Sequence, residues 1–302
     1  MLYVEQVNAS LQEQLSATGK AVVYGQNVAA GSRVGGLARN LADVPGCTVL
    51  NTPNAENALV GMGIGLALAG TPACFIMKQL DFSFLGIDQL LNTVAALRER
   101  SSDIRVPFVL LTVVVDSGFE GPQASANCLA PLAALLRVPV LTPSTSESVD
   151  RALESAFRQP FSIVGVSQKL MRRECQGSEA SYEPIAGWLA YPADPNHRAA
   201  DVTICLGFTG HAVLERDLAL GEDRSVDVLI SYSWDVGCIN QVVDLVAGYG
   251  RVTIRDDSKV MPSPGAALAT VIASRTPECD ITVIDRRDTE SWYRPAEDGV
   301  SR

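Results

Sequence analysis

A regular alternation of short β-branched runs with stretches of helical apolar spacing is the feature that most constrains the fold of this chain. Such alternation is typical of βαβ units, which place parallel strands in one sheet with helices on its faces. In the first half, the expected strands span residues 21–24, 47–50, 73–77, 107–115, 138–141 and 162–166. The expected helices of that half span residues 35–41, 54–70, 83–100, 129–136 and 146–157.

A charged, proline-containing stretch at residues 171–198 interrupts this pattern and is interpreted as a linker. A second series follows, with strands expected at 202–206, 226–231, 252–255 and 281–284 and helices at 211–219, 238–247 and 265–274. The chain of 302 residues is long enough for two ordinary domains. We therefore expect an α/β protein with two open, mainly parallel sheets, arranged as a domain 1–170, the linker 171–198, a domain 199–288 and a loose tail 289–302.

Composition and charge exclude several classes of partner. Hydrophobic residues make up 47% of the chain and charged residues 19%, so a sizeable core is expected. A net charge of −10 argues against nucleic acid or an anionic membrane as a partner, because both require clustered lysine and arginine. The longest apolar run, 106–115, is about half of a membrane span. Residues 1–11 lack the layout of a signal peptide, so a cytoplasmic location is expected.

Cysteine and histidine usage limits the possible chemistry. The seven cysteines are scattered without a CxxC pair, and we interpret them as buried, reduced thiols. The only histidines are His197 and His211, which leaves no set of residues suited to a metal cluster. A hydrolase that relies on a Ser-His or Cys-His pair is disfavoured for the same reason.

Glu56 is the most informative single residue of the sequence. It lies at the start of an expected helix that carries glycine at positions 61, 63 and 65, and each helical glycine costs about 1 kcal/mol relative to alanine. Close approach of another chain segment is the usual compensation. One interpretation of Glu56 is a carboxylate that favours the helix dipole. The other is a desolvated carboxyl group with raised proton affinity, suited to a proton relay. The glycine spacing does not match the GxGxxG motif of dinucleotide-binding proteins.

Two motifs resemble those of a known family. Residues 51–56 (NTPNAE) lead into the helix rich in glycine and alanine, and residues 81–92 read DFSFLGIDQLLN. In order and spacing they resemble the pyrimidine-binding domain of the transketolase family, above all the β subunits of pyruvate-type 2-oxo acid dehydrogenases. The second half is similar to the C-terminal domain of that family, so the resemblance covers about residues 15–285.

The resemblance implies thiamine diphosphate as cofactor and assigns roles by position. Glu56 matches the glutamate that bonds N1′ of the aminopyrimidine ring and promotes the tautomer that removes the proton from thiazolium C2. Phe82 matches the aromatic residue that stacks on the pyrimidine, although an ordinary core role stays open. Ala55 and Gln26 are expected near the cofactor. Asn27 is expected at the entrance for the substrate.

The chain departs from the family pattern in two places that bear on the substrate. The β subunits carry a histidine where this chain has Ala124, and a methionine where it has Lys78. Lys78 either binds a substrate oxygen or is a solvated or paired lysine, and Gln123 is a second candidate for substrate contact. These changes favour transfer of a two-carbon ketol or acyl unit, from a ketose or 2-oxo acid to an aldehyde or ketone, over a dehydrogenase component.

The family's diphosphate motif is missing from the sequence. That motif, GDG followed by asparagine, holds Mg²⁺ and the diphosphate, and no GDG occurs here. The resemblance therefore implies a split enzyme whose α-type partner carries GDG…N, in an α₂β₂ or similar assembly. The glycine-rich helix at 57–70 is the candidate for close interface packing.

Other functions stay open on the sequence alone. The chain could be the β subunit of a 2-oxo acid dehydrogenase first component. It could also be a non-catalytic α/β binding or scaffold subunit, or an unrelated doubly wound enzyme such as a flavoprotein.

Overall fold

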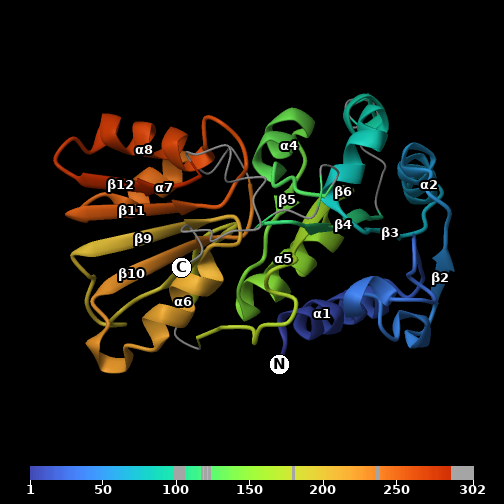
Figure 1. Ribbon diagram of the computed structural model, residues 1–302, viewed down its shortest axis with the longest axis horizontal. Helices are drawn as coiled ribbons and strands as arrows, with labels where there is room; N and C mark the ends of the chain where they lie inside the picture. The colour runs from blue at the N-terminus through green and yellow to red at the C-terminus, as the bar shows by residue number, and fades with distance from the viewer. Residues whose placement is uncertain are drawn as a thin grey trace.

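The computed structural model describes residues 1–94, 96–97, 106–116, 118, 121, 124–178, 181–234 and 239–286. Two six-stranded sheets with flanking helices lie next to one another along the longest axis of the molecule (Figure 1). This arrangement confirms the expectation of an α/β protein with two mainly parallel sheets.

The first sheet is parallel throughout, in the order β2-β1-β3-β4-β6-β5. Every residue of β3, β4 and β6 is buried, which accounts for their almost continuous apolar sequence. The chain runs outward from β1 to β2 and then returns to β3 on the other side of β1, so the order reverses at β1 and β3. The strands are β1 (Ala21–Gly25), β2 (Cys47–Asn51), β3 (Ala73–Met77), β4 (Phe108–Val114), β5 (Val140–Leu141) and β6 (Phe161–Ser167).

The second sheet has the order β12-β11-β9-β10-β8-β7. Its first four strands are parallel, whereas β8 runs antiparallel to both β10 and β7. The strands are β7 (Tyr182–Ile185), β8 (Trp188–Tyr191), β9 (Asp201–Leu206), β10 (Val226–Ser231), β11 (Arg251–Asp256) and β12 (Asp280–Ile284). The stretch 171–198, expected to be irregular, thus contributes two strands, because the four residues of β8 are all buried against β10. The exact domain bounds stay a prediction.

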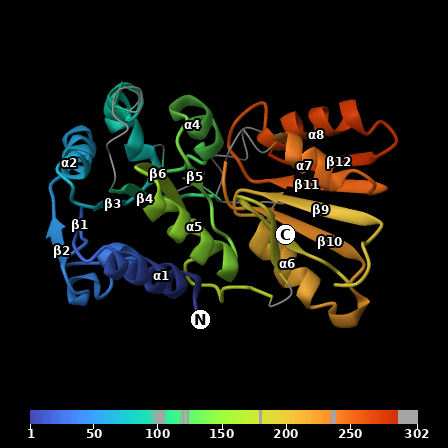
Figure 2. The ribbon, with the colours of Figure 1, turned by 180° about the vertical axis from the view of Figure 1, so that it is seen from behind.

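Helices cover both faces of the first sheet, with α1 and α5 on one side and α2 and α4 on the other (Figures 1 and 2). In the second half, α7 and α8 pack on the face opposite α6. The helices are α1 (Tyr3–Ala17), α2 (Glu56–Leu68), α4 (Leu129–Leu136), α5 (Ser146–Arg158), α6 (Gly210–Leu218), α7 (Ile239–Val246) and α8 (Pro264–Arg275).

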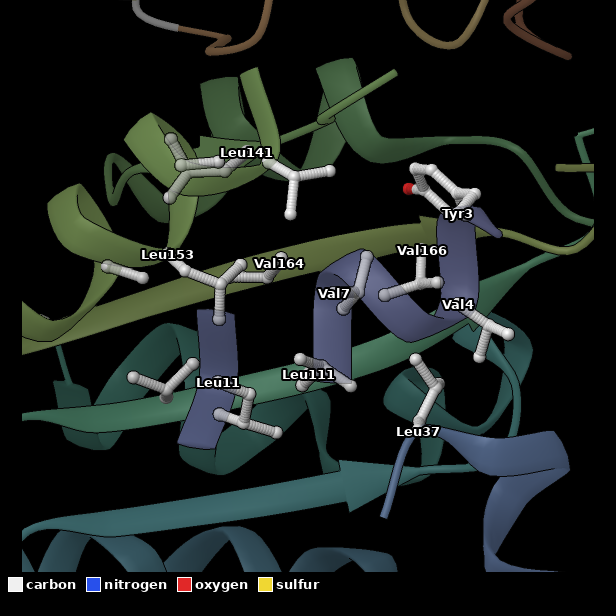
Figure 3. Close-up of a cluster of buried hydrophobic side chains, with 14 of the residues drawn as sticks. Tyr3, Val4, Val7, Leu11, Leu37, Leu111, Leu141, Leu153, Val164 and Val166 are labelled. Atoms are coloured by element: carbon white, nitrogen blue, oxygen red, sulfur yellow. The ribbon is translucent and has the colours of Figure 1, made fainter. Parts of the chain in front are cut away.

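Helix α1 lies outside the expected elements. Its buried residues Tyr3, Val4, Val7 and Leu11 recur at helical spacing and face the sheet, as the close-up in Figure 3 shows. Full burial of one such aliphatic side chain contributes about 1.5–3 kcal/mol, so this stripe anchors the helix firmly.

Two expected helices differ from the structure. Instead of a helix at 35–41, two short 3₁₀ segments form, η1 (Arg33–Gly36) and η2 (Leu41–Asp43), because Val34 and Gly35 have positive φ angles. The long helix expected at 83–100 begins as a 3₁₀ helix, η3 (Leu80–Gly86), and continues into a π-helical turn, η4 (Gln89–Thr93). Residues 95 and 98–100 lie outside the described part. A last 3₁₀ turn, η5, spans Gly221–Asp223.

The two halves share one continuous core. A single cluster of buried residues runs from α1 through Leu141 to Tyr191 and Ile230 of the second sheet. The backbone continues this contact, because Thr142 N donates to Tyr232 O at 2.9 Å and Trp234 N donates to Val140 O at 2.8 Å. Among the described residues, no helix has both the length and the apolar character that crossing a membrane requires.

Candidate active site

Three loops meet where the strand order of the first sheet reverses. In open parallel sheets, ligands bind at the carboxyl ends of the strands at such a reversal, here at β1 and β3. Thr52 N donates to Gly25 O at 3.0 Å, which joins the loop after β2 to the end of β1. Gly25 has φ +151°, and a Cβ there would lie 2.2 Å from Ile76 O. Glycine is therefore required where β1 and β3 end beside one another.

Glu56 is the first residue of α2, directly after the loop that follows β2. Only 9% of its surface is exposed, and its carboxyl group has no hydrogen bond or ion pair within the described part of the chain. Buried charged groups normally have a partner, so an unpaired carboxyl group in this position indicates a site for a ligand. The helix N-terminus favours negative charge there. The preceding residue, Ala55, is the helix N-cap and offers no side-chain cap.

Close packing brings η3 against the first turn of α2. A Cβ at Gly86 would lie 3.3 Å from Glu56 O and 2.9 Å from Val60 Cγ2, so only a residue without a side chain fits comfortably. As a result, the 3₁₀ helix that carries Phe82 runs beside Glu56.

The glycines of α2 have different environments. A Cβ at Gly63 would lie 2.3 Å from the Phe108 ring and 2.5 Å from Tyr24 Oη. Tyr24 in turn donates to Leu59 O at 2.8 Å, which holds its ring under the helix. Gly65 is exposed, and a Cβ at that position would meet no atom within 4 Å. Internal packing thus explains Gly63, and Gly65 leaves a smooth outer surface on the helix.

Phe82 is half-buried. Together with Ala55, it packs against the cluster of buried hydrophobic residues between α2 and the first sheet. The neighbouring hydroxyl groups of Thr52 and Ser83 are buried without a hydrogen-bond partner in the described part. An unpaired carboxyl group and, on the adjacent element, a partly exposed aromatic ring fit a flat heteroaromatic ligand with polar atoms on its edge. The residues present therefore fit an aminopyrimidine ring.

The remaining predicted residues are more peripheral. Gln26 is half-buried and Asn27 is exposed, with Asn27 at φ 53° in the left-handed region. Lys78 is exposed and has no ion pair or hydrogen bond among the described residues. Within that part of the chain, the alternative of a salt-bridged lysine is therefore excluded. Gln123 lies outside the described residues.

Asp81 is a residue of this region for which the sequence alone predicts no role. Its carboxyl group accepts hydrogen bonds from Ser125 N at 3.2 Å and Ala126 N at 3.1 Å. The loop after β3 is thereby joined to the segment that follows β4. Asp81 directly precedes Phe82, so this contact helps to set the position of the aromatic ring.

The cysteines of the described part are all free thiols, with Cys74 and Cys205 buried. Burial raises the pKa of Cys128 to about 12, so this thiol is un-ionised at neutral pH and a poor nucleophile. Cys238 lies outside the described residues.

Comparison with known proteins identifies the same region. The family model described as "Transketolase, pyrimidine binding domain" matches residues 2–173, more than half of the chain. Pyruvate dehydrogenase E1 component subunit beta-1, mitochondrial, of Oryza sativa subsp. japonica is 28% identical over 74% of this chain and 62% of that protein. The 2-oxoisovalerate dehydrogenase subunit beta of Bacillus subtilis (strain 168) is 24% identical over 92% of this chain and 85% of that protein.

The chain spans less than two thirds of the length of the rice protein. It likewise covers 61% of the corresponding subunit of Arabidopsis thaliana. A solved structure described as "Split gene transketolase, inactive beta4 tetramer" has a TM-score of 0.63 and 16% identity. The alignment covers 94% of this chain and 88% of that one, which shows a shared fold. On the family match and its position over the site, the chain belongs to the transketolase family defined by the pyrimidine-binding domain.

Proposed function

We propose that this chain is the β-type subunit of a two-component thiamine diphosphate enzyme and binds the aminopyrimidine end of the cofactor. The observation that carries the proposal is Glu56: only 9% of this residue is exposed, its carboxyl group has no partner in the described part of the chain, and it lies at the strand-order reversal. The family match over residues 2–173 supports the same cofactor.

Each residue of the site has a defined task in this proposal. The cofactor, when bound, supplies a nucleophilic carbon on its thiazolium ring. Glu56 holds a proton at N1′ of the pyrimidine ring, and the low exposure of this residue limits competition from water for that hydrogen bond. Phe82 packs on the face of the ring, and Ala55 and Gln26 contact its edge.

A partner chain completes the site. The sequence contains no GDG motif, so a second chain with GDG…N is proposed to hold the diphosphate and Mg²⁺ in an α₂β₂ assembly. The outer surface of α2 and η3 suits such a contact. Leu68 on α2 and Phe84 and Leu85 on η3 are all exposed large hydrophobic residues, and Gly65 on α2 lets another backbone approach.

The reaction is proposed to be transfer of a two-carbon ketol or acyl unit from a ketose or 2-oxo acid to an aldehyde or ketone. Lys78 is exposed and without a partner among the described residues, so its ammonium group is free to bind a carboxylate, phosphate or sugar oxygen of a substrate. Asn27 and Gln123 are the other proposed substrate contacts. A cytoplasmic location stays a prediction.

A second candidate is the β subunit of a 2-oxo acid dehydrogenase first component. The names of the similar rice and Bacillus proteins favour it, since both are dehydrogenase β subunits. Ala124, which stands where those β subunits are expected to carry a histidine, favours the transferase.

The test is to co-express the chain with a candidate partner that carries GDG…N, sought first in the neighbouring gene, and to add thiamine diphosphate and Mg²⁺. Pyruvate, 2-oxoisovalerate and xylulose 5-phosphate are the donor probes, and their consumption is followed with and without glycolaldehyde as acceptor. Acceptor-dependent consumption supports the transferase, whereas consumption that depends on a lipoyl acceptor supports the dehydrogenase component. A complex that binds no thiamine diphosphate would contradict both and favour the scaffold subunit.

A further inference from the structure

Two basic side chains from the second half hold the segment that follows β4. Lys259 Nζ donates to Gly118 O at 2.8 Å and to Ser125 O at 2.7 Å. Arg286 donates from Nη2 to Asp116 O and from Nε to Asp257 O at 2.9 Å. Three of these four contacts join backbone carbonyls of the first half to cations that lie more than 130 positions further along the chain.

Ser125 is held from both sides. Its backbone N–H donates to Asp81 on the first-half side, and its backbone carbonyl accepts from Lys259 on the second-half side. Asn127 strengthens the same junction, because Lys259 N donates to Asn127 O at 2.8 Å and Asn127 Nδ2 donates to Asp257 O at 2.9 Å. The chain of contacts therefore runs from Lys259 through Ser125 to Asp81 and ends at its neighbour, Phe82.

Burial argues that Lys259 has a task beyond filling space. Only 7% of its surface is exposed, and removing an ammonium group from water costs several kcal/mol unless specific partners replace the water. An apolar side chain of similar volume would pack at this position without that cost. What the ammonium group adds is directional hydrogen bonding to the two carbonyls on either side of the loop.

We propose that Lys259 is a positioning residue of the pyrimidine site, acting through Ser125 and Asp81 on the orientation of Phe82. The proposal rests on the proposed function. It gives the second half of the chain a task in cofactor binding, although that half contributes none of the residues that contact the ring.

The experiment measures the dissociation constant of thiamine diphosphate for the assembled complex in the presence of Mg²⁺, by calorimetry. Lys259→Met is expected to weaken binding about fivefold, comparable to Phe82→Ala, because the ring loses its fixed orientation. Lys259→Arg, which keeps donors near the carbonyls, is expected to restore most of the affinity. Lys20→Met removes an exposed lysine that is distant from Lys259 in the sequence, and it serves as the matched control. The affinity of this variant for thiamine diphosphate is expected to be unchanged.

A double-mutant cycle separates positioning from general loosening of the fold. In the Phe82→Ala background, Lys259→Met is expected to have almost no further effect on the dissociation constant, because both changes remove the same contact with the ring. Additive losses would overturn the proposal, as would wild-type affinity in Lys259→Met. If Lys259→Met does not assemble, Asp81→Ala takes its place in the same cycle, since it breaks the same chain of contacts from the first-half side.

Failure of the proposed function gives a different result. In that case the wild-type complex binds no thiamine diphosphate at all, so no effect of Phe82→Ala on cofactor affinity can be measured. When wild type binds and Phe82→Ala weakens binding, but Lys259→Met does not, only the positioning role is wrong.

Discussion

Gly86 and Glu56 lie against one another: a Cβ at Gly86 would be 3.3 Å from the carbonyl oxygen of Glu56. This contact packs η3, and with it Phe82, beside the first turn of α2. Glu56 and Phe82, two of the residues that the proposed function assigns to the pyrimidine ring, are therefore held on adjacent elements by close backbone packing.

Glu56→Gln is expected to reduce turnover of the assembled complex by about 10²–10⁴-fold, the usual contribution of a general acid or base. Glutamine keeps the size of the side chain, but its amide cannot give up and take back a proton as a carboxyl group does. Steady-state donor consumption is the measurement, and size-exclusion chromatography checks that the complex still assembles. Full activity in this variant would refute the role of Glu56.

Phe82→Ala is expected to raise the dissociation constant of thiamine diphosphate by about three- to tenfold, because aromatic stacking contributes about 0.5–1.5 kcal/mol. Phe82→Tyr keeps the ring and should bind the cofactor almost as tightly as wild type. Equal losses in both variants would show that the side chain serves only the core.

Two glycines of α2 should respond to alanine in opposite directions. Gly63→Ala places a Cβ 2.3 Å from the Phe108 ring and is expected to lower the free energy of unfolding by about 1–3 kcal/mol. Gly65→Ala adds a methyl group in open space and is expected to raise it by about 0.5–1 kcal/mol, because alanine is the better helix former. Urea unfolding of this chain without its partner measures both. A destabilised Gly65→Ala chain would mean that the helix surface is not open there.

His211 should make stability depend on pH. Burial lowers the pKa of His211 below its ordinary value of 6.5, and its Nδ1 has no partner in the described part, so the folded state favours the neutral ring. The unfolded chain therefore binds more protons below pH 6.5, and the free energy of unfolding falls as the pH drops from 6.5 through the folded-state pKa.

The check is urea unfolding at a series of pH values between about 5 and 8, the range in which histidine titrates. His211→Gln, which can still donate to Glu174 O, should reduce the loss of stability on the acid side. His197→Gln is the control, because His197 is exposed and its ring pairs with Asp194 at the surface. The histidine explanation would be wrong if both variants kept the wild-type slope.

Local signals in the sequence were sufficient for much of the fold, whereas the roles of the site residues stay a prediction. Strands such as β3 and β10 and the helix α4 are predicted with their observed bounds, because each is a short, strongly patterned run between turn residues. The stripe of α1 is equally regular but was not recognised. The strands β7 and β8 are not evident from the sequence because each has only four residues and lies in a stretch rich in proline and charge, and β8 pairs with β10, which is distant in the sequence.

Contacts between residues that are far apart in the sequence could not be predicted from local sequence patterns. Lys259 and Ser125 are 134 positions apart, and neither lies in a motif. Asp81 was part of a recognised motif, but its task depends on Ser125 and Ala126 coming next to it in space. Local periodicity does not report such pairings, which depend on how the two sheets meet.

The bonds between Val140, Thr142 and residues 232–234 have a consequence for truncated forms of the chain. A fragment that ends near residue 173 would contain the whole family match yet leave the β5 edge of its sheet without a neighbour. It would also expose the part of the shared core that includes Leu141. An open strand edge beside uncovered apolar surface recruits other chains, so such a fragment should aggregate on expression.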